Sequence, residues 1–228
     1  MNYFVTGTDT GVGKTLVSCA LLHGFAAQGK RVAGMKPVAA GCDGDGQNED
    51  ALRLLAAGNV AVSYELINPY CFRPAIAPHV AAQQAGIDIG FSRITESYRQ
   101  LAVLADVVIV EGAGGLCVPL NTRQDGADLI RELGLPVILV VGMRLGCLNH
   151  ALLTAEVIAS RGLTLAGWVA NVVEADMASV GENVAALQQR IAAPLLGIVP
   201  CLPQADARMV AGLIHLDRLG RIYNKDDR

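Results

Sequence analysis

The chain has few charged residues and few aromatic ones, and it contains no long basic run. Charged residues make up 17% of its 228 residues, aromatic residues make up 4%, and the formal net charge is −3 at pH 7. A protein that binds DNA, RNA or anionic lipid usually carries a basic patch, and this sequence has none. We therefore expect neither a nucleic acid nor a membrane surface as a partner.

Cysteines are present but show no pattern that holds a metal or builds a disulfide framework. No CxxC pair occurs, and no cysteine clusters with a histidine. We expect the six cysteines to be small buried hydrophobic residues of a protein in a reducing compartment. They stand at positions 19, 42, 71, 117, 147 and 201.

Two further absences concern membranes and covalent catalysis. The longest apolar run, Leu135 to Met143, is too short to span a bilayer, and the first residues lack the charged region of a secretory signal. We therefore expect a cytoplasmic protein. No GxSxG motif occurs, so the sequence indicates neither a serine nucleophile nor a covalent intermediate.

Apolar runs of strand length recur along the chain and alternate with segments of helical character. Most of these runs are continuous, which is typical of parallel strands that are buried on both faces. The pattern predicts a doubly wound α/β domain with a mostly parallel sheet. The expected strands are 3–6, 31–36, 106–111, 136–142, 165–171 and 195–199, and the expected helices are 13–29, 125–133, 147–161 and 177–192.

The length and the apolar content indicate one domain. A chain of 228 residues that is 52% hydrophobic builds one substantial core, so we assign residues 1–228 to a single domain. The polar tail, 223–228, is expected to fray. The Gly- and Asp-rich region 37–50 is predicted to be a long functional loop, and the proline-rich segment 63–90 yields no clear assignment.

The stretch VTGTDTGVGKT, Val5 to Thr15, carries the strongest motif. A Walker A loop reads GxxxxGK[ST], whereas Gly7 stands one place earlier and gives GxxxxxGKT. A glycine-rich turn with a solvated lysine is the alternative. A strand-like run before the stretch and an apolar-faced helix after it favour a phosphate-binding loop, and so a domain of the P-loop NTPase type.

In such a loop, backbone N–H groups point at phosphate oxygens beside the positive end of a helix dipole. The lysine then reaches the outer phosphates, and the hydroxyl that follows it ligates Mg²⁺. The sequence therefore predicts a nucleotide and Mg²⁺ as ligands. The expected contacts are Gly11, Val12, Gly13, Lys14, Thr15 and Leu16.

The second strand ends in GMKPVAAG and places Lys36 at the same edge of the sheet, where ligands of parallel sheets gather. A lysine at a strand end is commonly a solvated surface charge. Its position after an apolar strand and beside a phosphate site favours a catalytic role.

The strand in ADVVIVEGAGG delivers Glu111 to this edge, as a Walker B carboxylate that holds Mg²⁺ does. A surface glutamate at a turn is the alternative. The glycines that follow, Gly112, Gly114 and Gly115, favour a ligand site because glycine lets the backbone approach a ligand closely. Asp50 is a weaker second metal candidate and fits a helix N-terminal charge equally well.

The strand LAGWVANVV delivers Asn171. Its amide both donates and accepts, so it can read an adenine edge. A capping asparagine is an equal alternative.

Six blocks of sequence, in order along the chain, resemble the dethiobiotin synthetase family, the ATP-dependent enzymes that close the ureido ring on the way to biotin. The GxxxxxGKT spacing is the spacing of this family. The blocks run from residue 5 to residue 200: VTGTDTGVGKT, GMKPVAAG, EGAGGLCVPL, LPVILVVGMRLGCLNHALLTAE, LAGWVAN and APLLGIVP.

The resemblance implies a homodimer that converts 7,8-diaminopelargonic acid, CO₂ and Mg-ATP to dethiobiotin, ADP and phosphate. One amine captures CO₂ as a carbamate, ATP phosphorylates the carbamate, and the second amine attacks the mixed anhydride and expels phosphate. This chemistry needs positioning and charge neutralisation more than a protein nucleophile. The resemblance implies catalytic roles for Lys36 and Lys14, and metal binding by Thr15, Asp50 and Glu111.

The resemblance also implies which residues contact four parts of the site. These parts are the diamine, the reaction centre, the adenine and the substrate's carboxylate tail. The tail is expected to meet backbone amides of the neighbouring subunit, in the segment RLGCLNHALL, where a helix N-terminus suits an anion. The residues are, in that order, Thr10 and Ala40; Gly112, Ala113 and Gly114; Asn171, Val172, Pro200, Cys201 and Leu202; and Gly146, Cys147 and Asn149.

The sequence departs from the family in three places, one of which is an acid after the adenine loop that some relatives have and that only Asp206 could match here. Ala40 stands where some relatives have a serine that contacts substrate, and Gly11 stands where some have a glutamate. Both lysines and the metal-binding acids are retained, so the expected reaction is unchanged.

Two alternatives come from other classes. Dimeric switch ATPases of partition and division sites share this P-loop type but resemble GKGGxGKT, with a lysine where this chain has Asp9. They also tend to carry basic membrane- or DNA-binding surfaces. A module that only senses ATP does not need Lys36, EGAGG and RLGCLNHALL together, although fold alone does not exclude it.

Overall fold

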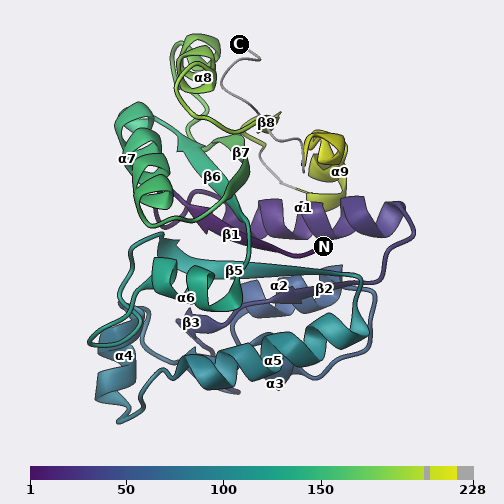
Figure 1. The fold of residues 1–228 in the computed structure, drawn as a ribbon, viewed down its shortest axis with the longest axis vertical. Coiled ribbons are helices and arrows are strands. Elements are labelled where there is room, and N and C mark those ends of the chain that lie inside the picture. Colours follow the sequence, from purple (N-terminus) through teal and green to yellow (C-terminus); the bar gives the residue numbers. More distant parts are fainter. Residues whose placement is uncertain (203–205, 220–228) are drawn as a thin grey trace.

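The computed structural model describes residues 1–202 and 206–219, and it contains a six-stranded parallel sheet with the order β2-β5-β1-β6-β7-β8 (Figure 1). The predicted doubly wound, mostly parallel α/β fold is confirmed. Its strands are β1 (Tyr3–Gly7), β2 (Val32–Met35), β5 (Val107–Gly115), β6 (Val137–Met143), β7 (Leu165–Val172) and β8 (Leu195–Val199).

All the predicted helices are present, with shorter bounds. They are α1 (Lys14–Ala27), α6 (Gly126–Leu133), α7 (Cys147–Ser160) and α8 (Val180–Gln188). In the described part of the chain, no helix is both long and apolar enough to cross a membrane. The tail that we expect to fray, 223–228, lies outside the described residues.

Helices cover both faces of the sheet because alternate strand residues point to opposite sides. Tyr3 and Val5 of β1 pack into a cluster with α1 and α9 (Ala207–Ala211), whereas Phe4 packs into a cluster with α6 and α5 (Phe91–Leu104). Both kinds of position are buried, which explains why the strands read as continuous apolar runs.

Two regions contain more structure than predicted. The expected loop 37–50 includes β3 (Val38–Ala40) and the start of α2 (Glu49–Ala57). The unassigned segment 63–90 contains α3 (Tyr64–Ile67), β4 (Tyr70–Phe72) and α4 (Pro78–Gln84). β3 and β4 pair in parallel as a separate two-stranded sheet, and the short η1 (Leu216–Arg218) follows α9. These strands are too short for their sequence pattern to stand out.

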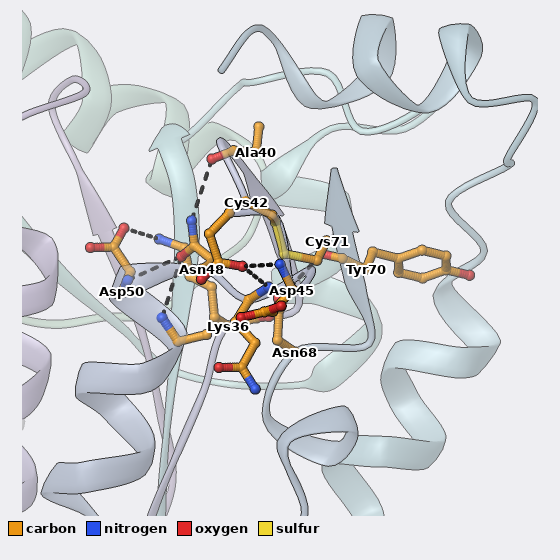
Figure 2. Close-up of a disulfide and its surroundings, with 12 residues drawn as sticks. Lys36, Ala40, Cys42, Asp45, Asn48, Asp50, Asn68, Tyr70 and Cys71 are labelled. Atoms are coloured by element: carbon orange, nitrogen blue, oxygen red, sulfur yellow. Dashed lines mark hydrogen bonds and ion pairs between the residues drawn. A yellow bond between two sulfur atoms is a disulfide. The ribbon is translucent and has the colours of Figure 1, made fainter. Parts of the chain in front are cut away.

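The prediction that all the cysteines are buried thiols is wrong. Cys42 and Cys71 form a disulfide beside the β3–β4 pair, with Cα atoms 6.2 Å apart (Figure 2). Cys117 and Cys201 are exposed, and only Cys19 and Cys147 are buried free thiols among the described residues. The spacing of 29 residues carries no disulfide signal, because strand pairing brings the two cysteines together.

Candidate functional site

The loop between β1 and α1 is shaped by close backbone packing. A β carbon on Gly7 would lie 2.6 Å from Cγ2 of Val12, so only glycine fits at that point. Gly13 has φ of 89° and a β carbon there would lie 2.2 Å from the Asn171 side-chain amide. Both glycines are therefore required by geometry, and Val12 between them is buried.

Asn171 braces this loop from the neighbouring strand β7. Its side-chain amide donates a 2.8 Å hydrogen bond to the carbonyl of Val12, and Asn171 itself is buried. A buried carbonyl without a partner costs free energy, so this contact holds the loop in its turn. The sequence suggested adenine reading or capping for Asn171 and did not reveal this contact.

The first turn of α1 is open to an anion. Gly13 caps the helix in a left-handed conformation, and no side chain caps its first N–H groups. Lys14 is the first helical residue, and its Nζ donates to the carbonyl of Asp9 at 2.9 Å. Burial, with repulsion from Lys36, lowers the pKa of Lys14 to about 8. The backbone and the lysine together form an electropositive site at a helix N-terminus.

Lys36, Glu111 and Asp50 meet beside this loop. The Lys36 ammonium lies 2.6 Å from Oε1 of Glu111 and 3.3 Å from Oδ2 of Asp50. It also donates to the carbonyl of Gly112 at 3.3 Å. The Thr15 hydroxyl donates to the same Glu111 oxygen at 2.9 Å. The structure therefore brings together the residues predicted for catalysis and metal binding.

The electrostatics of this group follow from burial and pairing. Burial alone disfavours the charged form of Lys36, but the carboxylates of Glu111 and Asp50 outweigh it and raise the pKa. Burial also raises the pKa of Asp50, and the opposing effects of Lys36 and Thr15 leave it below its ordinary value. Lys36 is thus a cation and Asp50 an anion at neutral pH.

The oxygen atoms here suit a magnesium ion. Oε2 of Glu111 is buried and has no hydrogen-bond partner among the described residues, although a buried carboxylate oxygen normally has one. No group of three or more His, Cys, Asp or Glu side chains lies together in the described ranges. Mg²⁺ typically takes one or two carboxylates plus substrate phosphates and water, so the two acids and the Thr15 hydroxyl fit that ion.

A pocket of about 520 Å³ opens from this group toward the β3–β4 pair. Its lining combines the polar atoms of the site with apolar walls, which suits an aliphatic substrate with polar ends. It includes the predicted residues Thr10, Lys36, Ala40, Asp50, Ala113 and Gly114, together with Ala39, Asn48, Val118 and the segment 75–78. The predicted substrate residues Thr10, Lys36 and Ala40 therefore share one cavity.

Other predicted residues lie at the same edge of the sheet. Asn171 pairs in register with Val199 of β8, so Pro200, Cys201 and Leu202 follow beside it. Val172 ends β7. Gly146, Cys147 and Asn149 begin α7, and none of them is among the residues that line the pocket.

Two asparagines support the site and were missed from sequence. Asn48 caps α2 by accepting from the N–H groups of Asp50 and Ala51 at 3.1 and 3.3 Å. Asn68 donates to the carbonyl of Lys36 at 2.6 Å. The NEDALRL stretch is a helix-start signal from which a cap at Asn48 could have been predicted, whereas nothing in NPY indicates a contact with Lys36.

The exposed ion pair between Arg144 and Asp9 was also missed. The two side chains are 2.5 Å apart, and Oδ1 of Asp9 accepts from the Thr10 N–H at 2.7 Å. Asp9 therefore pairs within the chain at the place where switch ATPases carry a lysine.

These features define a class of protein: a P-loop ATPase with a parallel sheet and a buried acid facing the loop threonine. An AAA domain family model matches residues 1–209. The chain is 56% identical to the ATP-dependent dethiobiotin synthetase BioD of Nitrosospira multiformis over 96% of each chain. It is 54% identical to that of Aromatoleum aromaticum, over 94% of this chain and 96% of the relative. The chain belongs to the ATP-dependent dethiobiotin synthetase family.

Solved structures with a similar fold include cell-division proteins. The MinC:MinD complex of Aquifex aeolicus has a TM-score of 0.54 at 14% identity, covering 89% of this chain and 82% of that one. MinD of Pyrococcus horikoshii has a TM-score of 0.51 at 17% identity, covering 96% and 89%. At these identities the likeness shows the shared fold and does not favour a division-site function.

Proposed function

We propose that the protein carboxylates 7,8-diaminopelargonic acid with CO₂ and closes the ureido ring at the expense of ATP, giving dethiobiotin, ADP and phosphate. The observation that carries this is the position of Lys36, which lies between the phosphate loop and the 520 Å³ pocket. ATP use follows from the family, and we include a cytoplasmic location in the proposal because ATP and biotin precursors are available there.

The chain's own groups suit each stage. An amine of the substrate captures CO₂ as a carbamate in the pocket, where the Lys36 ammonium favours the anion. The carbamate oxygen then attacks the γ-phosphoryl group, which Lys14 and the loop N–H groups orient. The second amine attacks the mixed anhydride and expels phosphate. No step needs a protein nucleophile.

In this proposal Lys36 acts in its protonated form. Its pKa is raised by Glu111 and Asp50, so its Nζ acts as a fixed positive charge and hydrogen-bond donor. It also donates to the Gly112 carbonyl, which places the EGAGG loop against the reaction centre. Charge that develops on the transferring phosphoryl group is thereby neutralised without reorganisation.

Mg²⁺ forms part of the proposal. Thr15, Asp50 and Glu111 would hold it, and when bound it supplies positive charge to the phosphates. At the other end of the nucleotide, we propose that Asn171, Val172, Pro200, Cys201 and Leu202 surround the adenine. The support is their adjacency at the edge formed by β7 and β8.

We propose that the active form is a homodimer in which α7 completes the partner's pocket. Gly146 caps α7 with φ of 92° and leaves its first N–H groups without a side-chain cap, so they are open to a carboxylate. Leu145 and Leu153 are 95% and 58% exposed beside it, which indicates a covered surface. The pocket within one chain has no residue from this helix.

The decisive assay uses purified protein with Mg-ATP, labelled bicarbonate and the diamine. Acid-stable label should form one-for-one with ADP, and only when the diamine is present. ATP hydrolysis that is indifferent to the diamine would instead favour a switch ATPase, and a protein partner would then be sought.

A further inference from the structure

The disulfide between Cys42 and Cys71 joins two walls of the candidate substrate pocket. Cys42 follows β3, whose Ala39 and Ala40 line the pocket, and Cys71 lies in β4, which leads to lining residues 75–78. Figure 2 shows the disulfide in the same close-up as Lys36 and Asp50. Both cysteines are partly exposed, as attack by a small thiol requires.

A hydrogen-bonded chain connects Cys71 to the catalytic residues. The Tyr64 hydroxyl lies 3.9 Å from Sγ of Cys71, accepts from the Asn48 N–H at 2.8 Å and contacts Oδ1 of Asn68 at 3.0 Å. Asn48 caps the turn that carries Asp50, and Asn68 holds the carbonyl of Lys36.

The turn between the disulfide and α2 depends on few contacts of its own. Residues 43–46 are exposed, and the turn is closed mainly by Asp43, which accepts from the N–H groups of Asp45 and Gln47 at 3.1 and 2.8 Å. Asn48 also donates weakly to the Ala40 carbonyl at 3.4 Å. Hydrogen bonds also join this side to β4: the Cys42 N–H donates to the Phe72 carbonyl at 3.1 Å, and Arg73 donates to the Gly44 carbonyl at 3.3 Å. The disulfide is the covalent tie between the two sides, and it stays closed when exposed hydrogen bonds open.

We propose that Cys42 and Cys71 form a thiol–disulfide exchange site for small-molecule thiols, whose state sets how tightly the pocket holds Mg-nucleotide and diamine. The oxidised form holds β3, β4 and the Asn48 cap in place, so that Asp50 stays aimed at Lys36. The reduced form releases the turn and weakens binding. The diamine part of this inference rests on the proposed function.

A glutathione-class thiol supplies the two electrons that reduce the disulfide. A first thiolate attacks one sulfur of the pair, forming a mixed disulfide and freeing the other cysteine as a thiolate, which takes up a proton. A second thiolate attacks the mixed disulfide, frees the remaining cysteine and leaves as the small-molecule disulfide. Oxidation runs the same two steps in reverse and consumes a small-molecule disulfide.

The test equilibrates the wild-type protein in reduced and oxidised glutathione buffers. Free thiols are trapped with a maleimide and located by peptide mass, and Mg-ADP affinity is measured by calorimetry on the same samples. We expect residues 42 and 71 to titrate together, and the oxidised form to bind Mg-ADP about fivefold more tightly or better. The KM for the diamine should shift in the same direction.

Two variants serve as comparisons. Cys42→Ser/Cys71→Ser should bind like the reduced wild type and ignore the glutathione ratio, whereas Cys117→Ser, which removes an exposed unpaired thiol, should respond as the wild type does. If the serine variant is unstable, the comparison of Mg-ADP affinity between the oxidised and reduced wild type still tests the proposal, because it needs no substitution. Cysteines 42 and 71 that stay reduced in oxidised buffer, or two forms with equal Mg-ADP affinity, overturn the proposal. Failure to form dethiobiotin in either form contradicts the proposed function instead.

Discussion

Lys36 and Glu111 form an ion pair that is almost completely removed from water: their charged atoms are 2.6 Å apart, and their side chains are 6% and 0% exposed. Removing one partner of such a pair typically costs about 3 to 5 kcal/mol, because the other charge stays buried. Lys36 also lines the 520 Å³ pocket, and a buried charge beside such a pocket is a candidate for a functional role.

Replacement of Lys36 by alanine should affect turnover far more than ATP affinity. The lysine lines the pocket, whereas we assign the phosphates mainly to Lys14 and the loop backbone. We expect kcat to fall about 100-fold or more, with the dissociation constant for ATP changed only a few-fold. Steady-state kinetics and calorimetry measure the two quantities, and the exposed Lys30→Ala is the control. Equal losses of both would remove the catalytic role.

Glu111→Gln should weaken the Mg²⁺ dependence and the rate together. The substitution keeps the shape of the side chain but removes the negative charge that pairs with Lys36. It also replaces one carboxylate oxygen with an NH₂ group, which cannot ligate a metal. We expect the Mg²⁺ concentration for half-maximal rate to rise about tenfold, as one lost charged ligand predicts. Glu132→Gln, on the exposed face of α6, is the matched control. Unchanged Mg²⁺ titration would place Glu111 outside the metal site.

Asn171→Ala tests whether this residue braces the loop. Because its amide holds the Val12 carbonyl, its loss should weaken ATP and tripolyphosphate binding alike, by about tenfold, even though tripolyphosphate has no base. Calorimetry with both ligands measures this. A variant that binds tripolyphosphate normally but loses its preference for ATP over GTP would show that Asn171 reads the base instead.

Complementation tests the shared site. Lys36→Ala disables a chain's own pocket, and Gly146→Val strains the left-handed turn at the start of α7, where nothing lies within 4 Å of the added carbon. Each variant alone should be nearly inactive. A refolded equal mixture should regain about a quarter of wild-type activity, since heterodimers contain one intact site. A mixture no more active than its components would place the complete site within one chain.

The sequence predicted the parts of this protein that depend on local pattern. The long apolar strands and the GxxxxxGKT loop were read correctly because burial on both faces and glycine geometry leave strong signals. The β3–β4 pair, the Asn68 contact with Lys36 and the Cys42–Cys71 disulfide were missed. Each of these is a contact between residues that are distant in sequence and lie in or beside short elements. Such contacts leave no periodic pattern in the sequence, so they could not be predicted from it.

The pH dependence of nucleotide binding should reveal Lys14. Its pKa is lowered to about 8 by burial and by Lys36, so it is charged below that pH and neutral above it. A phosphate group favours the charged lysine, and ATP affinity should therefore be constant below pH 7 and fall as pH rises through about 8. Lys14→Arg should show no such fall, because a guanidinium stays protonated. Calorimetry between pH 6 and about 9.5 makes the comparison, within the range where Lys36 remains charged. Superimposable profiles for the two proteins would mean that another group titrates, and Lys14 would lose its assigned contact with the outer phosphates.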